Sequence, residues 1–140
     1  RGHVAFHESG IPFADSRMLL VRLDENTVAN AVADGHFPRV EDSPRYAVSM
    51  GVELVYEARE VVLLASGNRK TDPVAESLLG DPDPAVPISY GKTYARKGGR
   101  IVYILDREAG EKALGHADRI RAEGIEIEDV SGAETEAPRP

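Results

Sequence analysis

The chain has 140 residues, of which 41% are hydrophobic, so it can build one domain around a single core. Its formal net charge of -7 excludes an extended nucleic-acid-binding surface, because such a surface needs clustered Lys and Arg. The absence of Cys excludes disulfides and thiolate sites, and no apolar run approaches the ~20 residues of a membrane span. We therefore expect a cytoplasmic protein with neither a nucleic-acid nor a membrane partner.

The first part of the chain predicts a strand and two helices. Residues 18–23 form a short apolar run, typical of a strand, and the polar cluster 24–27 that follows is typical of a helix start. This helix would end at Gly35, where a left-handed backbone is favoured. Residues 36–42 show no hydrophobic period and predict a loop. A second helix is expected over residues 44–59, because its apolar residues recur at helical spacing.

The middle of the chain contains the clearest strand. Residues 61–65 are a continuous aliphatic run, as expected for a strand buried on both faces of a parallel sheet. The polar turn 66–71 leads into a helix over residues 72–80. A proline-stiffened connection follows at 81–87. Residues 90–99 are polar and basic, and they predict a short helix or a loop.

The last part of the chain predicts a strand, a helix and a tail. Residues 100–105 are strand-like, and Asp106 is an N-cap for a final helix that continues to Ile120. The segment beyond Gly124 has too little apolar content to order itself. We therefore expect an α/β domain over residues 1–124 and a polar, disordered tail over 125–140.

The alternation of strands and helices indicates the fold class. Three strands separated by helices and short connections predict an open α/β sheet of mainly parallel strands with flanking helices. Such sheets bind ligands at the carboxyl ends of their strands. The functional residues should therefore follow the strands.

The turn after the strand at 61–65 is one candidate site. Gly67 and Lys70 lie in this turn, where free backbone N–H groups and the helix dipole would favour an anion such as a phosphate. Turns between a strand and a helix also commonly carry Gly and polar residues that only face water. The residues alone support both interpretations equally.

The opening segment is a second candidate site. His3, His7 and Glu8 lie close together, and an imidazole beside a carboxylate is suited to moving protons near neutral pH. These residues lack the spacing of common metal motifs, and a hydrogen-bonded structural role is the ordinary alternative. The chain begins with Arg1 rather than Met, so we expect that preceding residues, with any catalytic partners among them, are missing.

Four segments in register resemble glucosamine-6-phosphate deaminases, which are related to 6-phosphogluconolactonases. The opening GHVAFHE is similar to the family's Gly-His-Ile-Ala-Phe-Asn-Glu. The other three begin at Leu23, Ser43 and Asp83 and read LDENTVANA, SPRYAVSMGVELVYEAREVVLLASGNRK and DPAVPIS. The resemblance spans most of residues 2–89 and corresponds to the C-terminal part of the family's Rossmann-like domain.

The resemblance implies an activity and a set of site residues. The family converts glucosamine 6-phosphate to fructose 6-phosphate and ammonia, as an isomerase and deaminase of amino-sugar catabolism without cofactor or metal. By position, His3 resembles the acid/base that opens the sugar ring, Glu8 the carboxylate that orients it, and Lys70 a ligand of the substrate phosphate, with Gly67 beside it. Arg1 and His7 would lie near the substrate.

The chain also departs from the family pattern. Arg1 replaces an Asp that partners the histidine, Val32 replaces a phosphate-binding Arg, and His7 replaces an Asn. The family's proton-abstracting carboxylate and glycine-rich phosphate loop belong to its N-terminal half, so this chain alone is expected to be inactive. The alternatives are a 6-phosphogluconolactonase-like hydrolase and a catalytically degenerate sugar-phosphate-binding protein. The oligomeric state stays open, a homo-oligomer being one outcome.

Overall fold

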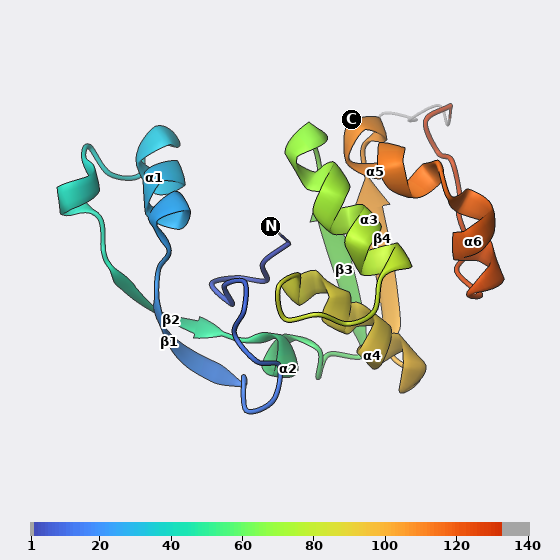
Figure 1. Cartoon of the computed structure of the whole chain (residues 1–140), viewed down its shortest axis with the longest axis horizontal. Helices are drawn as coiled ribbons and strands as arrows, with labels where there is room; N and C mark the ends of the chain where they lie inside the picture. The colour runs from blue at the N-terminus through green and yellow to red at the C-terminus, as the bar shows by residue number, and fades with distance from the viewer. Residues whose placement is uncertain (1, 133–140) are drawn as a thin grey trace, which may run out of the picture.

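The computed structural model describes residues 2–132 of the chain (Figure 1). The strands and helices, in chain order, are β1 (Met18–Arg22), α1 (Glu25–Ala33), β2 (Tyr46–Met50), α2 (Val52–Val55), β3 (Glu60–Ala65), α3 (Thr71–Leu79), α4 (Tyr90–Arg96), β4 (Arg100–Leu105), α5 (Arg107–Leu114) and α6 (Ala117–Ala122). Short 3-10 turns, Val40–Asp42, Asn68–Lys70 and Pro87–Ser89, stand before β2, α3 and α4.

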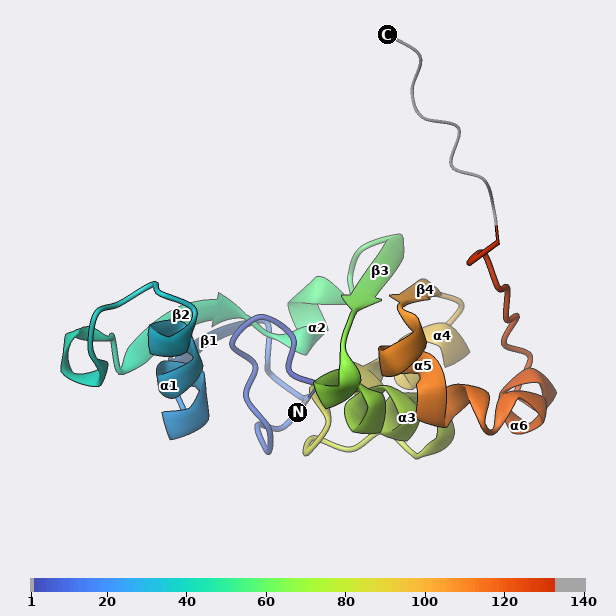
Figure 2. The same cartoon turned by 90° about the horizontal axis from the view of Figure 1, so that it is seen from above.

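The strands form two separate pairs. β1 and β2 are antiparallel, whereas β3 and β4 are parallel and in register from the pair Glu60 and Arg100 to the pair Ala65 and Leu105. The helices α3, α4 and α5 lie on one side of the β3–β4 pair (Figure 2). The β1–β2 pair and α1 extend to the other end of the molecule (Figure 1).

Two clusters form the core. The first joins α3 to α5 and α6 through Val74, Ala75, Leu78, Ala113 and Ile120. The second joins α2 to α4 through Val52, Tyr56 and Tyr94. The rings of Tyr56 and Tyr94 meet edge to face, with centroids 5.3 Å apart. Burial, followed by the nearby phenols of Tyr103 and Tyr94, raises the pKa of Tyr56, so its hydroxyl stays protonated.

Several local predictions are confirmed. Residues 18–22 and 100–105 are strands, and the helix after Asp24 ends before Gly35, whose φ of 78° is left-handed. Asp24 accepts a hydrogen bond of 2.8 Å from the backbone N–H of Thr27, as an N-cap does. Asp106 caps α5 in the same way, through the N–H of Ala109 at 2.8 Å.

The prediction of a helix over residues 44–59 is wrong. This stretch forms β2 and the four-residue helix α2. Tyr46, Val48 and Met50 also repeat with a period of two, and their strand pairs with β1. The tertiary pairing therefore overrides the helical spacing, and the extended backbone of Gly51 separates the two elements.

The expected sheet is confirmed only in part. β3 and β4 are parallel, but among residues 2–132 the sheets have two strands each, and one of them is antiparallel. β3 is not buried on both faces, because Val62 and Leu64 are 51% and 74% exposed. Helices cover one face of the β3–β4 pair, and these two side chains point to the other.

The C-terminal part differs from the expected single helix. The final helix is divided at Gly115 and His116 into α5 and α6. Ile125 and Ile127 pack against the first core cluster. The division into a domain over 1–124 and a tail over 125–140 stays a prediction, and residues 133–140 lie outside the described residues. No helix within residues 2–132 is long and apolar enough to cross a bilayer.

Candidate functional site

The opening segment begins against the start of α3. Gly2 has a φ of 67°, and a Cβ built on it would lie 3.0 Å from the Cβ of Pro73 and 3.0 Å from the Cγ1 of Ile88. The backbone N–H of Ile88 donates to the Gly2 carbonyl at 2.8 Å. Both views place the first described residues beside the N-terminal part of α3 (Figures 1 and 2). Since Lys70 directly precedes α3, His3 and Lys70 lie at the same end of the β3–α3 unit.

His3 is exposed, and within residues 2–132 one hydrogen bond orients its ring. Its Nδ1 lies 2.9 Å from the carbonyl oxygen of Ala5, so this nitrogen carries the hydrogen and donates it. Nε2 is then the proton acceptor of the ring. Ala5 has a φ of 47° in the tight turn that His7 closes by donating its N–H to the Val4 carbonyl at 2.8 Å. The strained turn thus presents the carbonyl that orients His3.

Glu8 is held by α1. The side chain is 8% exposed, and its Oε1 accepts a 2.7 Å hydrogen bond from the hydroxyl of Thr27. In this structure the carbonyl of Ala5, and not Glu8, is the hydrogen-bond partner of His3. The orienting role of Glu8 therefore stays a prediction. Sequence reasoning assigned Thr27 only to a helix start, and no local signal marks it as the partner of Glu8.

His7 is fully buried and joins two segments. The backbone N–H of Val52 donates to its Nδ1 at 3.2 Å, and Nε2 donates to the carbonyl of Ile11 at 3.0 Å. Both nitrogens are used, and the residue is 0% exposed. This arrangement favours the structural role over contact with a substrate.

A matched pair of substitutions tests this role of His7. We expect His7→Ala to lower the free energy of unfolding by about 2–4 kcal/mol, because it opens a cavity and leaves the Val52 N–H buried without a partner. His36→Ala, at an exposed loop position, should change it by less than about 0.5 kcal/mol. Urea denaturation followed by circular dichroism measures both. Equal stability of the two variants would contradict the structural role.

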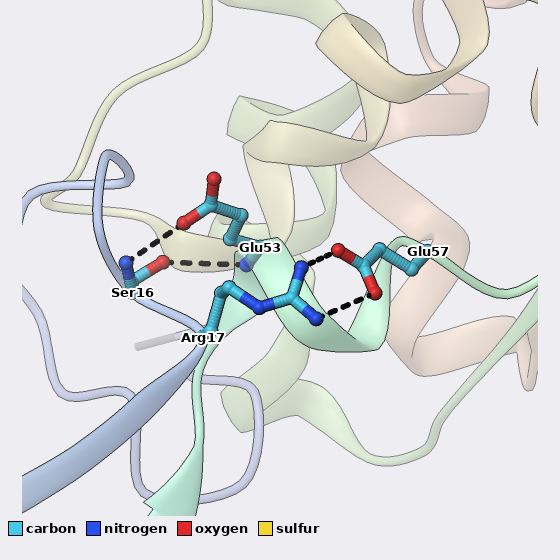
Figure 3. Close-up of polar contacts among 4 residues, drawn as sticks. All are labelled: Ser16, Arg17, Glu53 and Glu57. Atoms are coloured by element: carbon cyan, nitrogen blue, oxygen red, sulfur yellow. Dashed lines mark hydrogen bonds and ion pairs between the residues drawn. The ribbon is translucent and has the colours of Figure 1, made fainter.

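Two further contacts fix the end of the opening segment on α2 (Figure 3). Ser16 donates its N–H to Glu53 Oε2 at 3.0 Å, and its Oγ accepts the Glu53 N–H at 3.2 Å. Arg17 forms an ion pair with Glu57 through both nitrogens of its guanidinium end. The Ser16 hydroxyl and His7 Nδ1 accept the N–H groups of Glu53 and Val52, in the first turn of α2, which have no partner within the helix. They also hold the segment that carries His3.

The turn before α3 differs from the free anion seat that the sequence predicts. Gly67 has the expected left-handed φ of 81°. However, its N–H donates to Asp106 Oδ2 at 2.9 Å, and the N–H of Asn68 donates to Glu108 Oε2 at 3.0 Å. The expectation that these amides are free is therefore wrong. The phosphate-binding roles of Lys70 and Gly67 stay a prediction.

Lys70 itself is available to an anion. Its side chain is half-buried and makes no ion pair with any residue between 2 and 132. Nearby, Lys112 binds Asp72 of α3 at 2.9 Å, and this hydrogen bond raises the pKa of Lys112. The described part of the chain brings no three His or acidic side chains together in a way that could hold a metal ion. Arg1 lies outside the described residues.

Known proteins similar to this chain point to one family, although no protein-family model matches it. The glucosamine-6-phosphate deaminase of Shouchella clausii is 33% identical over 108 residues, which are 77% of this chain and 41% of that protein. The glucosamine-6-phosphate deaminase of Rhodopirellula baltica is 36% identical over 108 residues, covering 77% of this chain and 40% of the relative. The chain is homologous to the C-terminal portion of glucosamine-6-phosphate deaminases.

A solved structure agrees with this relationship. A monomeric glucosamine-6-phosphate deaminase of the NagB superfamily superposes with a TM-score of 0.67 at 29% identity, covering 79% of this chain and 43% of that protein. A 6-phosphogluconolactonase from Trypanosoma cruzi reaches a TM-score of only 0.46 at 25% identity, covering 79% of this chain and 36% of that protein. The chain spans about two fifths of the length of the glucosamine-6-phosphate deaminases it matches.

Proposed function

We propose that this chain supplies the ring-opening and phosphate-binding part of an enzyme that converts glucosamine 6-phosphate to fructose 6-phosphate and ammonia. The observation that carries the proposal is the packing of Gly2, next to the exposed His3, on Pro73 near the start of α3, which Lys70 precedes, and Lys70 has no ion-pair partner among residues 2–132. A sugar with a phosphate at one end and a reacting carbon at the other requires both kinds of group. The similarity to glucosamine-6-phosphate deaminases supports the choice of substrate.

The proposed role of His3 follows from the tautomer of its ring. Nδ1–H donates to Ala5, so Nε2 takes the proton of the anomeric hydroxyl. The same proton then passes to the ring oxygen as the bond between that oxygen and the anomeric carbon breaks. Both oxygens are bonded to the same carbon, so one nitrogen can reach both, and the ring opens without net gain or loss of protons.

The later steps need groups that this chain does not supply. Isomerisation requires a base that removes a proton from the carbon bearing the amine, and the family resemblance assigns that carboxylate to the N-terminal half. We therefore propose that the 140-residue chain alone is inactive. We assign the activity to a protein in which such an N-terminal half precedes this chain, and the experiments below use that intact protein.

A second candidate, a catalytically degenerate sugar-phosphate-binding protein, is favoured by Val32, because the family resemblance places a phosphate-binding Arg at this position. Assaying ammonia release from glucosamine 6-phosphate, together with calorimetric binding, separates the candidates. Release supports the deaminase, and binding without release supports the degenerate protein. Hydrolysis of 6-phosphogluconolactone in the absence of ammonia release would instead support the lactonase alternative.

The phosphate contact has its own test. We expect Lys70→Ala in the intact protein to weaken binding of glucosamine 6-phosphate by about 1.5–3 kcal/mol, as for the loss of a charge-assisted hydrogen bond. Arg69→Ala is the matched control, because Arg69 is the neighbouring cation and is exposed. Isothermal titration calorimetry measures both. If the two variants bind equally well, Lys70 is not the phosphate ligand.

A further inference from the structure

Two carboxylates from the start of α5 occupy the turn before α3. Asp106 accepts from the N–H of Gly67 with one oxygen and caps α5 through the N–H of Ala109 with the other. Glu108 accepts from the N–H of Asn68 at 3.0 Å, and its backbone carbonyl accepts from the hydroxyl of Thr71 at 2.9 Å. The turn therefore already holds anionic oxygens, and they belong to the protein itself.

The two carboxylates differ in how easily they can release the backbone amides of the turn. Asp106 is fixed because both of its oxygens bind backbone amides in different segments. Glu108 is exposed, and the Asn68 amide is the one hydrogen-bond partner that the described chain gives its carboxylate. A rotation of the Glu108 side chain would free this amide without disturbing the N-cap of α5.

We propose that Glu108 is an internal competitor of the substrate phosphate and sets the affinity of the site for it. The proposal rests on the function proposed above. An amide that donates to a carboxylate can donate equally well to a phosphate oxygen, and Asn68 stands two residues before Lys70. The incoming phosphate displaces the Glu108 carboxylate, takes the Asn68 amide and pairs with Lys70. Binding therefore includes the cost of this displacement and of the repulsion between the two anions.

The experiment is calorimetric titration of the intact protein with inorganic phosphate and with glucosamine 6-phosphate. Glu108→Gln keeps the size of the side chain and removes its charge, and Glu108→Ala removes the competitor altogether. Glu111→Gln is the matched control, because Glu111 is an exposed carboxylate of the same helix, three residues further on. Each substitution is also combined with Lys70→Ala.

We expect both Glu108 variants to bind phosphate about 5- to 10-fold more tightly, with less than about a twofold change for Glu111→Gln. The gain should shrink at high salt, as a screened Coulomb effect does, and should persist on a weaker overall affinity in the Lys70→Ala background, because Glu108 occupies the Asn68 amide and not Lys70. Unchanged affinity in the Glu108 variants, with Lys70-dependent binding in the wild type, would overturn this proposal and leave the proposed function intact. If neither the wild type nor the two Glu108 variants bind phosphate, both the competitor role of Glu108 and the proposed function are overturned.

Discussion

Replacing His3 with Gln in the intact protein is expected to slow turnover of closed-ring glucosamine 6-phosphate by ~10²-fold or more, the usual range for a lost acid/base group. Gln can still donate and accept hydrogen bonds, but it cannot exchange a proton with the substrate. The exposed ring, with Nδ1 engaged at the Ala5 carbonyl, gives His3 no evident structural role that the substitution would disturb. The loss should therefore appear in kcat rather than in stability.

Three comparisons make the His3 result interpretable in steady-state assays of ammonia release. Glu8→Gln should reduce turnover less than the His3 change, because Glu8 contacts Thr27 rather than the ring. His36→Gln, at an exposed loop position, should have no effect. Binding of a phosphorylated sugar analogue should survive all three substitutions, since Lys70 holds the phosphate in the proposed site. Unchanged turnover in His3→Gln would exclude the acid/base role and leave the binding protein as the better candidate.

The sequence predicted those elements whose local signals agree with one another. Asp24 and Asp106 are N-caps followed by helices, and the aliphatic runs at 61–65 and 100–105 are strands, because propensity, capping and length all favour the same structure. In residues 44–59 the apolar side chains fit both the spacing of a helix and the period of two of a strand. Pairing with β1 decided between them, and that pairing depends on residues far away in the sequence.

For the candidate site, the sequence predicted a location, which stays a prediction, but it did not predict the contacts of the site residues. The order of the motifs assigned His3 and Lys70 to one site, and the packing of Gly2 on Pro73 is consistent with it. The partners of the site residues come from distant elements. Thr27 lies on α1 and Glu108 on α5, so neither contact follows from spacing along the chain. Sequence reasoning also could not decide whether His7 faces a ligand or the interior, because that depends on burial.

The junction between β2 and α2 is where a single methyl group should have the largest effect on stability. Gly51 donates its N–H to the Arg17 carbonyl at 3.1 Å, and a Cβ at this position would overlap the carbonyl oxygen of Ser16. Ser16 cannot move away, because its N–H and Oγ are both bound to Glu53. We therefore expect Gly51→Ala to lower the free energy of unfolding by about 3 kcal/mol, at the upper end of the usual cost of overpacking.

The matched control is Gly115→Ala, between α5 and α6. Gly115 has a φ of -58°, and the nearest atom to an added Cβ is the Lys112 carbonyl oxygen at 3.4 Å. Alanine fits there, so stability should stay the same or rise by about 0.4–1 kcal/mol, because alanine restricts the unfolded chain. Urea denaturation of the two variants measures the difference. Wild-type stability of Gly51→Ala would show that Ser16 and Gly51 are not in close contact, and the anchoring of the His3 segment on α2 would then have to be abandoned.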